Sequence, residues 1–171
     1  MKNSPPVFSQ TSIPFVIISL ILVFLISLGI AFLVSDPIMA FLLSLFVFLS
    51  LILLLRLTLA AHHSKGVQLV KKTAFEPAII EFEKSYAFLT RYPWIDKFRA
   101  LTLLSPSAWS YREMALCNIA FCYLQLNQAN KAVEYYNKAL EEFPNSSLAK
   151  YSLKTIQSVQ NSLGPTKTDE K

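Results

Sequence analysis

The first third of the chain consists of two long apolar segments with almost no charge. There is no charged residue between Lys2 and Asp36, and none between Asp36 and Arg56. Residues 13–34 and 38–60 each reach the length of roughly 20 residues that a helix needs to cross a hydrocarbon core about 30 Å thick. The pattern therefore predicts two transmembrane helices behind a short N-terminal tail, residues 1–12.

A very short polar connection, Ser35-Asp36-Pro37, joins these two segments. Proline cannot continue a helix but suits the first position of a new one, so Pro37 predicts an antiparallel helical hairpin. Basic residues are absent from the connection and follow the second segment, which places both termini in the cytoplasm. The residues expected at the lipid interface are Arg56, Lys65, Lys71 and Lys72.

Apolar segments of this kind have three other interpretations. A cleaved signal peptide has an apolar core of about 7–15 residues and a small-residue cleavage site, and residues 13–34 fit neither. A chain this short has no room to bury two entirely apolar helices in a soluble core. A re-entrant hairpin that enters and leaves on one face stays open, because the turn at Asp36-Pro37 is so tight.

The remainder of the chain has interspersed charges and a helical periodicity. Two of its segments, residues 78–89 and 132–143, resemble each other. Ala132, Tyr136 and Ala139 align with Ala78, Phe82 and Ser85. Steps of four and three place each triplet on one helix face, where small residues let a neighbouring helix approach.

Upstream of Ala132, apolar residues recur at the same helical spacing, and Asn127-Gln128 form a polar break. On these residues, the segment 113–146 resembles one tetratricopeptide repeat. The positions that match the packing signature of that family are Leu116, Ile119, Ala120, Tyr123, Ala132, Tyr136, Ala139 and Pro144. The resemblance implies an all-α fold in which antiparallel helix pairs stack on one another.

A degenerate copy of the repeat is expected at about residues 59–92. Gly66 and Leu69 take the small and aromatic positions of its first helix, whereas His62 and Lys65 stand where large apolar residues are expected. Capping boxes are predicted at Thr73–Glu76 and Ser110–Glu113. The second membrane helix then runs almost directly into the helical domain, residues 61–161.

An insert, residues 93–109, separates the two copies. One interpretation is an extra helix over 95–104 that packs on the repeats. The other is an amphipathic surface that contacts the membrane or a partner. In that case Arg91, Lys97 and Arg99 face phosphates, and Trp94, Phe98 and Leu101 face the acyl boundary.

The end of the chain is expected to close the stack. Residues 147–161 predict a capping helix, because Lys150, Lys154 and Gln157 stand where a further repeat would bury apolar groups. Residues 162–171 are short and polar, which is typical of a disordered tail.

No catalytic, cofactor or metal constellation is found, and we expect a non-enzymatic protein. His62 and His63 are adjacent, so their side chains point about 100° apart on a helix, and two ligands do not make a zinc site. Cys117 and Cys122 are expected to pack as small hydrophobic residues. The acids Glu81, Glu83, Glu134, Glu141 and Glu142 are expected mainly on solvated faces. The net charge of +5 is interpreted as a feature that attracts the chain to anionic lipid, and not as a sign of nucleic-acid binding.

The family resemblance implies a concave groove for a protein or peptide. The residues expected to face it are Met114, Asn118, Phe121 and Gln125. In chaperone-binding members an Asn at the position of Asn118 holds a peptide carboxylate. The other clamp positions here are His63, Val67, Leu148 and Ser152, so chaperone-tail binding is not predicted.

The sequence thus predicts an N-terminal transmembrane helical hairpin followed by a stack of the tetratricopeptide-repeat type with a C-terminal capping helix. The expected function is a membrane-anchored interaction module, a scaffold or assembly factor, whose partners are the lipid bilayer and an unidentified protein or a second copy of the chain. Two alternatives remain. One is an oligomeric, membrane-shaping hairpin. The other is an accessory subunit of a transport or secretion complex, held through Ser19, Ser27, Gly29 and Ser44.

Overall fold

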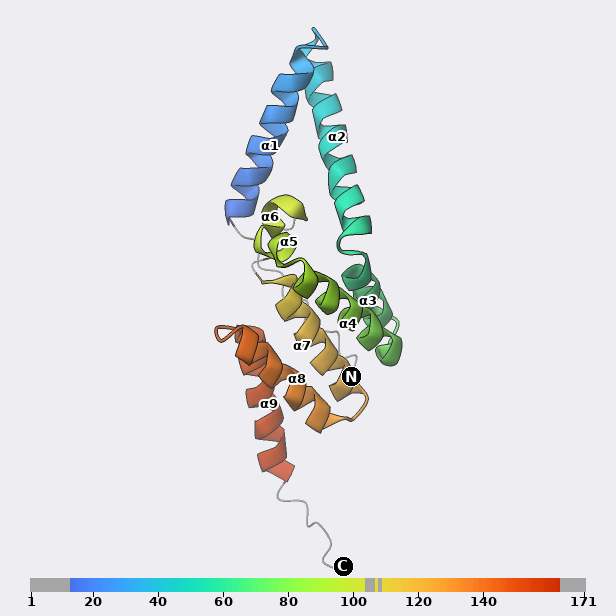
Figure 1. Cartoon of the computed structure of the whole chain (residues 1–171), viewed down its shortest axis with the longest axis vertical. Coiled ribbons are helices and arrows are strands. Elements are labelled where there is room, and N and C mark those ends of the chain that lie inside the picture. The colour runs from blue at the N-terminus through green and yellow to red at the C-terminus, as the bar shows by residue number, and fades with distance from the viewer. Residues whose placement is uncertain (1–12, 104–106, 108, 164–171) are drawn as a thin grey trace, which may run out of the picture.

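The computed structural model describes residues 13–103, 107 and 109–163. The predicted N-terminal tail and residues 164–171 lie outside this description. Within it the elements are helices, and an apolar hairpin extends from one end of a helical stack (Figure 1). The helices are α1 (Ile13–Ala31), α2 (Pro37–Thr58), α3 (Ala61–Lys71), α4 (Phe75–Arg91), α5 (Pro93–Lys97), α6 (Arg99–Thr102), α7 (Tyr111–Gln125), α8 (Ala129–Glu142) and α9 (Ser147–Leu163).

The hairpin turn follows from one aspartate and one proline. Pro37 occupies the first turn of α2, as predicted. The Asp36 carboxylate accepts hydrogen bonds from the backbone N–H groups of Ile38 at 2.9 Å and Met39 at 3.4 Å. These bonds satisfy donors that a helix start leaves free. The chain therefore reverses direction within a few residues.

Only a narrow stripe of the hairpin is covered by protein. Ala40, Ser44 and Phe48 are buried at spacings of four residues on one face of α2, which packs against α1. The Ser44 hydroxyl donates to the Ala40 carbonyl at 2.5 Å, so this polar group is satisfied within its own helix. Apolar side chains dominate the uncovered surface: Phe24 is 66% exposed and Phe32 is 87% exposed.

The two apolar helices differ in length. Among the described residues, Pro37–Leu55 of α2 is long and apolar enough to cross a membrane, judged by length and composition. The corresponding apolar stretch of α1, Leu20–Ala31, is shorter. α1 also ends at Ala31, earlier than the expected boundary at residue 34.

The helix pairs α3–α4 and α7–α8 turn in the same way. The backbone N–H of Ala74 donates to the Leu69 carbonyl at 2.9 Å, and the N–H of Gln128 donates to the Tyr123 carbonyl at 2.8 Å. Such bonds close a helix when the residue after its C-cap adopts a left-handed conformation. That residue is Thr73 (φ 59°) in the first pair and Asn127 (φ 57°) in the second.

The predicted capping box at Thr73 is therefore wrong. Thr73 ends α3, and its hydroxyl donates to the Lys72 carbonyl at 2.6 Å. The N-cap of α4 is Ala74, which makes no side-chain cap bond. The sequence pattern at Thr73 fits a helix start, but the left-handed backbone conformation of Thr73 ends the previous helix.

Small residues on the first helix of each pair allow the second helix to approach. A Cβ atom at Gly66 would lie 2.7–2.9 Å from ring atoms of Phe82. In the second pair Ala120 and Tyr136, at the aligned positions, are both buried. The other signature residues Leu116, Ile119, Ala132 and Ala139 are also buried, whereas Tyr123 is half-buried and Pro144 is exposed.

Two core clusters run through these pairs. Cys117 belongs to the cluster between α7, α8 and α9, and Cys122 to the cluster between α3, α4 and α7. Both thiols are free and buried, and burial raises the pKa of each to about 12. The prediction that they pack as small hydrophobic residues is confirmed.

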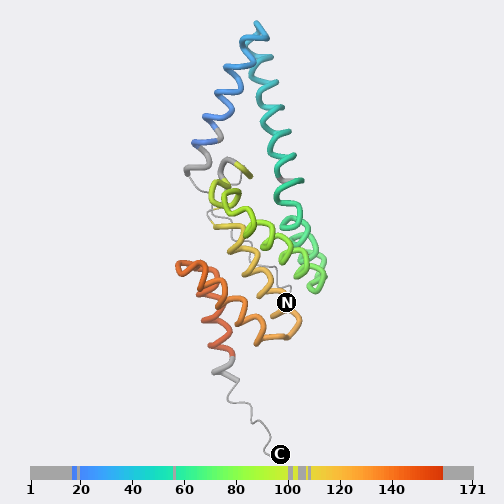
Figure 2. Tube along the Cα trace, in the orientation of Figure 1, coloured from blue at the N-terminus to red at the C-terminus, as the bar shows by residue number. Residues whose placement is uncertain are grey.

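The insert forms two short helices, so the predicted single helix over 95–104 is wrong. The helices α5 and α6 are separated at Phe98, which serves as C-cap of one and N-cap of the other. Ile95 and Leu103 are buried with Ala60 and Leu89. This cluster joins the end of α2 to α4 and the insert, and α6 also contacts α1. In the Cα trace the chain passes from α2 into α3 almost without a linker (Figure 2).

The helix α9 packs on α8. The Ser146 hydroxyl accepts a hydrogen bond from the Ala149 N–H at 3.2 Å, which caps this helix start. Lys150, Lys154 and Gln157 are exposed, as expected for a helix with a solvated outer face.

The contact between Gly66 and Phe82 predicts the effect of one methyl group. We expect Gly66→Ala in the full chain to lower the free energy of unfolding by about 1–3 kcal/mol, because the buried ring must shift. Phe82→Leu in the same chain should restore part of this loss. The measurement is thermal unfolding in detergent followed by circular dichroism.

Gly29→Ala is the matched control, because no atom lies within 4 Å of a Cβ placed at Gly29. Equal unfolding midpoints for the Gly66→Ala and Gly29→Ala proteins would contradict the close approach of α3 and α4.

Candidate protein-docking site

The start of α7 is fixed by two polar side chains. The Ser110 hydroxyl accepts hydrogen bonds from the backbone N–H groups of Arg112 at 3.2 Å and Glu113 at 3.4 Å, so the predicted N-cap is confirmed. Glu113 does not complete the expected capping box: it is buried, and its Oε1 has no hydrogen-bond partner.

Asp96 on α5 provides a second cap that the sequence did not indicate. Its buried carboxylate accepts from the Tyr111 N–H at 2.8 Å, the Arg112 N–H at 3.2 Å and the Ser110 hydroxyl. A carboxylate at a helix N-terminus is stabilised by the free N–H groups and the helix dipole. Asp96 therefore fastens the insert to the first helix of the second repeat.

The four predicted groove residues lie on one face of α7. Met114, Asn118, Phe121 and Gln125 follow one another in steps of four and three, and each is half-buried. The Phe121 ring meets the Phe75 ring edge-on, with centroids 6.4 Å apart. Part of this face is thus covered by the first repeat.

The remaining clamp positions offer no cation to a peptide carboxylate. Val67 and Leu148 are partly buried against the two cores, and Ser152 is half-buried. His63 lies inside the protein between the rings of Phe82 and Tyr111, with centroids at 5.5 and 4.9 Å. Burial lowers the pKa of His63 to about 4, against an opposing effect of Asp96, so its imidazole is neutral at pH 7.

A buried carboxylate joins α3 to α4. Glu81 Oε2 lies 2.7 Å from His62 Nδ1, and its Oε1 lies 3.0 Å from Lys65 Nζ and 3.4 Å from Lys84 Nζ. Glu81 is only 5% exposed. The expectation that it lies on a solvated face is therefore wrong. Its pKa falls to about 2, chiefly through the hydrogen bond from His62 and then that from Lys65.

The polar contacts around Glu81, called the Glu81 cluster below, explain why the first copy of the repeat departs from the family pattern. His62 and Lys65 occupy positions that align with the buried residues Leu116 and Ile119 of the second copy. In the described part of the chain, α3 and α4 form the end of the stack next to the hairpin, so large apolar groups at these two positions would have no further helix pair to pack against. Polar side chains that converge on Glu81 hold α3 to α4 instead.

The Glu81 cluster predicts a specific pH dependence. The folded pKa of about 2 lies below the ordinary value of 4.5. The ionised carboxylate therefore stabilises the fold above about pH 4.5, and this stabilisation is lost as the pH falls toward 2. We expect Glu81→Gln to lower the free energy of unfolding by about 1 kcal/mol at pH 7, because its partners are half-exposed.

Chemical denaturation of both proteins between pH 2 and 7 measures this difference. The Glu81→Gln and wild-type stabilities should converge as the pH approaches 2. The matched control is Glu141→Gln, at an exposed position of α8, which should follow wild type throughout. A constant difference across the whole range would contradict the assigned role of the carboxylate.

A second polar network joins α4, α7 and α8. The Tyr86 hydroxyl donates to the Glu142 carboxylate, which also pairs with the Arg112 guanidinium. Arg112 lies over the Tyr86 ring at 5.8 Å and the Phe143 ring at 5.7 Å. Burial and the nearby carboxylate raise the pKa of Tyr86. Glu142 is thus half-buried and does not lie on a solvated face as expected.

The basic residues assigned to the lipid interface have different surroundings. Lys65 pairs with Glu81, as described above. Lys71 and Lys72 are exposed at the far end of α3, roughly 15 Å of helix beyond its start. The side chain of Arg56 lies outside the described residues.

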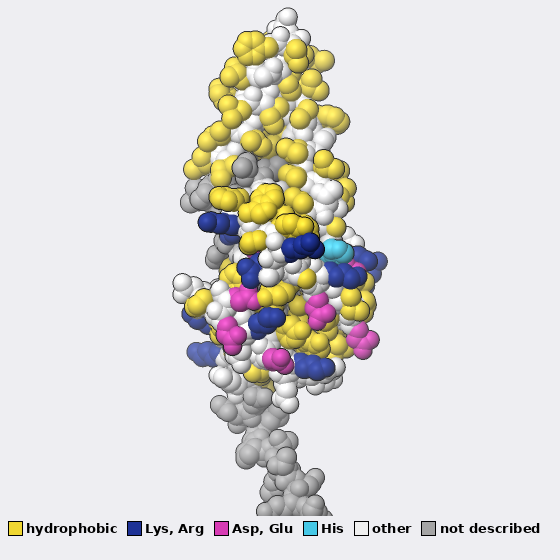
Figure 3. All heavy atoms as spheres, viewed as in Figure 1, with side chains coloured by type: hydrophobic (Ala, Val, Ile, Leu, Met, Phe, Trp, Pro, Cys, Tyr) yellow, Lys and Arg dark blue, Asp and Glu magenta, His cyan; other side chains and the backbone are white. Residues whose placement is uncertain are grey.

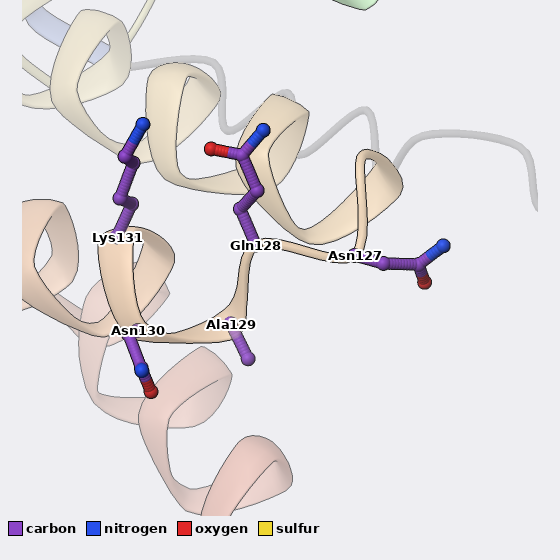
Figure 4. A pocket seen from close by; sticks show the side chains of 5 residues that line it. All are labelled: Asn127, Gln128, Ala129, Asn130 and Lys131. Carbon is purple, nitrogen blue, oxygen red and sulfur yellow. The ribbon is translucent and has the colours of Figure 1, made fainter.

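A shallow hollow of about 350 Å³ lies at the turn between α7 and α8 and is lined by residues 127–131. Its polar side chains do not converge (Figure 4). Gln128 and Lys131 project to one side of the turn, Asn130 projects to the other, and Asn127 points away. This hollow therefore has no arrangement that would orient a small ligand.

Comparison with known proteins identifies one part of the chain. Residues 114–146, which cover most of α7, all of α8 and the turn before α9, match the family model of the tetratricopeptide repeat. No curated protein and no solved structure matches the chain. The match and the stacked helix pairs together support a protein of the tetratricopeptide-repeat type. Such repeats are typically non-catalytic modules that bind other proteins.

Proposed function

We propose that the chain is a membrane-anchored protein-interaction module, a scaffold or assembly factor that presents a short groove close to the bilayer. The observation that supports it most is the junction between two unlike parts. A helical stack that contains an interaction repeat is joined, through an apolar cluster of α4 and the insert, to a hairpin whose apolar surface is mostly uncovered.

The distribution of charge supports insertion of the hairpin into lipid. Hydrophobic side chains cover the hairpin and continue to the level of α5 and α6 (Figure 3). Several Lys and Arg side chains lie directly beyond them, and other Lys and Arg side chains lie among most of the Asp and Glu side chains, farther from the hairpin. Because basic residues stay preferentially on the cytoplasmic side, we propose that both termini are cytoplasmic.

The docking role is assigned to the face of α7 that carries Met114, Asn118 and Gln125. This face is short, so a single contact of this size gives modest affinity. Anchoring to a membrane raises the local concentration of module and partner, which compensates for a weak individual contact. Self-association through a second copy would serve the same purpose.

The test is proximity labelling of the full-length protein in its own membrane. Asn118→Arg places a long charged side chain in the proposed groove. We expect it to remove at least one reproducible neighbour, with a several-fold loss of labelling. Asn137→Arg is the matched control, because Asn137 is exposed on α8, outside the groove, and it should retain every neighbour.

Identical neighbours for the Asn118→Arg, Asn137→Arg and wild-type proteins would argue against the groove. If all association then depended on the hairpin alone, the protein would be better described as an oligomeric membrane-shaping hairpin.

A further inference from the structure

The insert has two faces with different roles. Its inward face holds Ile95, Asp96 and Leu103, each at most 4% exposed, which attach it to α7 and to the end of the hairpin. Arg99 also turns inward: its Nε donates to the Ser107 carbonyl at 3.1 Å and its guanidinium to the Asp96 carbonyl at 3.3 Å. The expectation that Arg99 faces lipid phosphate is therefore wrong.

The outward face is aromatic and basic. Trp94 and Phe98 are each 55% exposed, and Tyr92 is 39% exposed. The Arg91 guanidinium lies 5.6 Å from the centre of the Tyr92 ring, and Lys97 Nζ lies 5.7 Å from the centre of the Phe98 ring. We call Arg91, Tyr92, Trp94, Lys97 and Phe98 the aromatic–basic patch.

The position of the patch indicates what covers it. The patch lies at the open end of the hairpin, where α6 contacts α1, and the exposed apolar surface there is continuous with that of the hairpin (Figure 3). Tryptophan and tyrosine prefer the headgroup level of a bilayer, where an amphipathic ring meets both environments. Arginine and lysine beside them meet the lipid phosphates. A hairpin that enters lipid brings this patch to that level.

We infer that the aromatic–basic patch is a lipid-binding surface that seats the helical domain in the headgroup layer of an anionic membrane. Trp94 and Phe98 enter the boundary between headgroups and acyl chains, and Arg91 and Lys97 pair with lipid phosphates. This inference rests on the proposed insertion of the hairpin. Its consequence is a fixed orientation of the α7 face relative to the membrane.

The test is tryptophan fluorescence of the full-length protein in vesicles of phosphatidylcholine and phosphatidylserine. Trp109→Phe leaves Trp94 as the one tryptophan of the chain, which has two. Lipids brominated near the headgroup should quench Trp94 several-fold more than a control tryptophan. That control is Tyr151→Trp in a chain with Trp94→Phe and Trp109→Phe, because Tyr151 is 73% exposed on α9, at the end opposite the hairpin (Figure 1).

The charged residues give a second readout. Quenching of Trp94 should decrease when phosphatidylserine is omitted, and Arg91→Gln with Lys97→Gln should abolish this dependence on lipid charge. The protein could resist extraction from the vesicles while Trp94 is quenched no more than the control tryptophan. That result would refute the lipid-binding surface and would indicate that the patch binds a protein instead. If the protein does not insert into the vesicles at all, the proposed membrane anchor itself fails.

Discussion

The hydrophobic surface of the hairpin is the constraint on which the rest of the structure depends. Among its described side chains only Ala40, Ser44 and Phe48 are buried on one face of α2, and most of the Leu, Ile and Phe side chains are exposed. Exposure of this apolar surface to water is unfavourable in free energy. Burial of the surface in lipid would remove that unfavourable contribution. Polar groups of such helices must be satisfied internally: the Asp36 carboxylate accepts from two backbone N–H groups at the start of α2, and the Ser44 hydroxyl donates to the Ala40 carbonyl.

The attachment of the hairpin to the helical stack determines how a bound partner would be held. Ala60, Leu89, Ile95 and Leu103 form one buried cluster, and Asp96 ties the same insert to the start of α7. Motion of α7 relative to α2 would have to break at least one of these two contacts. The α7 face is therefore joined to the hairpin by a short, packed connection and not by a flexible linker, so the fold sets its distance from the proposed membrane span.

The elements that sequence analysis predicted are those with a strong local signal. Pro37 marked the hairpin turn, and the alignment of Ala132, Tyr136 and Ala139 with an earlier triplet indicated the repeats. The polar contacts were missed, because Glu81 with His62 and Asp96 with Tyr111 are far apart in sequence. Thr73 was misassigned, because its φ of 59° is the left-handed conformation that ends α3, whereas an N-cap residue has an extended backbone. The spacing of the predicted groove residues correctly placed them on one face of α7. It could not predict the contact of Phe121 with Phe75, because that contact depends on how the two helix pairs stack.

Extraction of the full-length protein from its membrane with alkaline carbonate tests the central claim most directly. A chain whose two apolar helices lie in lipid remains in the membrane pellet after this treatment and is released by detergent. Recovery of the intact chain in the carbonate supernatant, still soluble without detergent, would show that other protein covers the hairpin and would contradict the account.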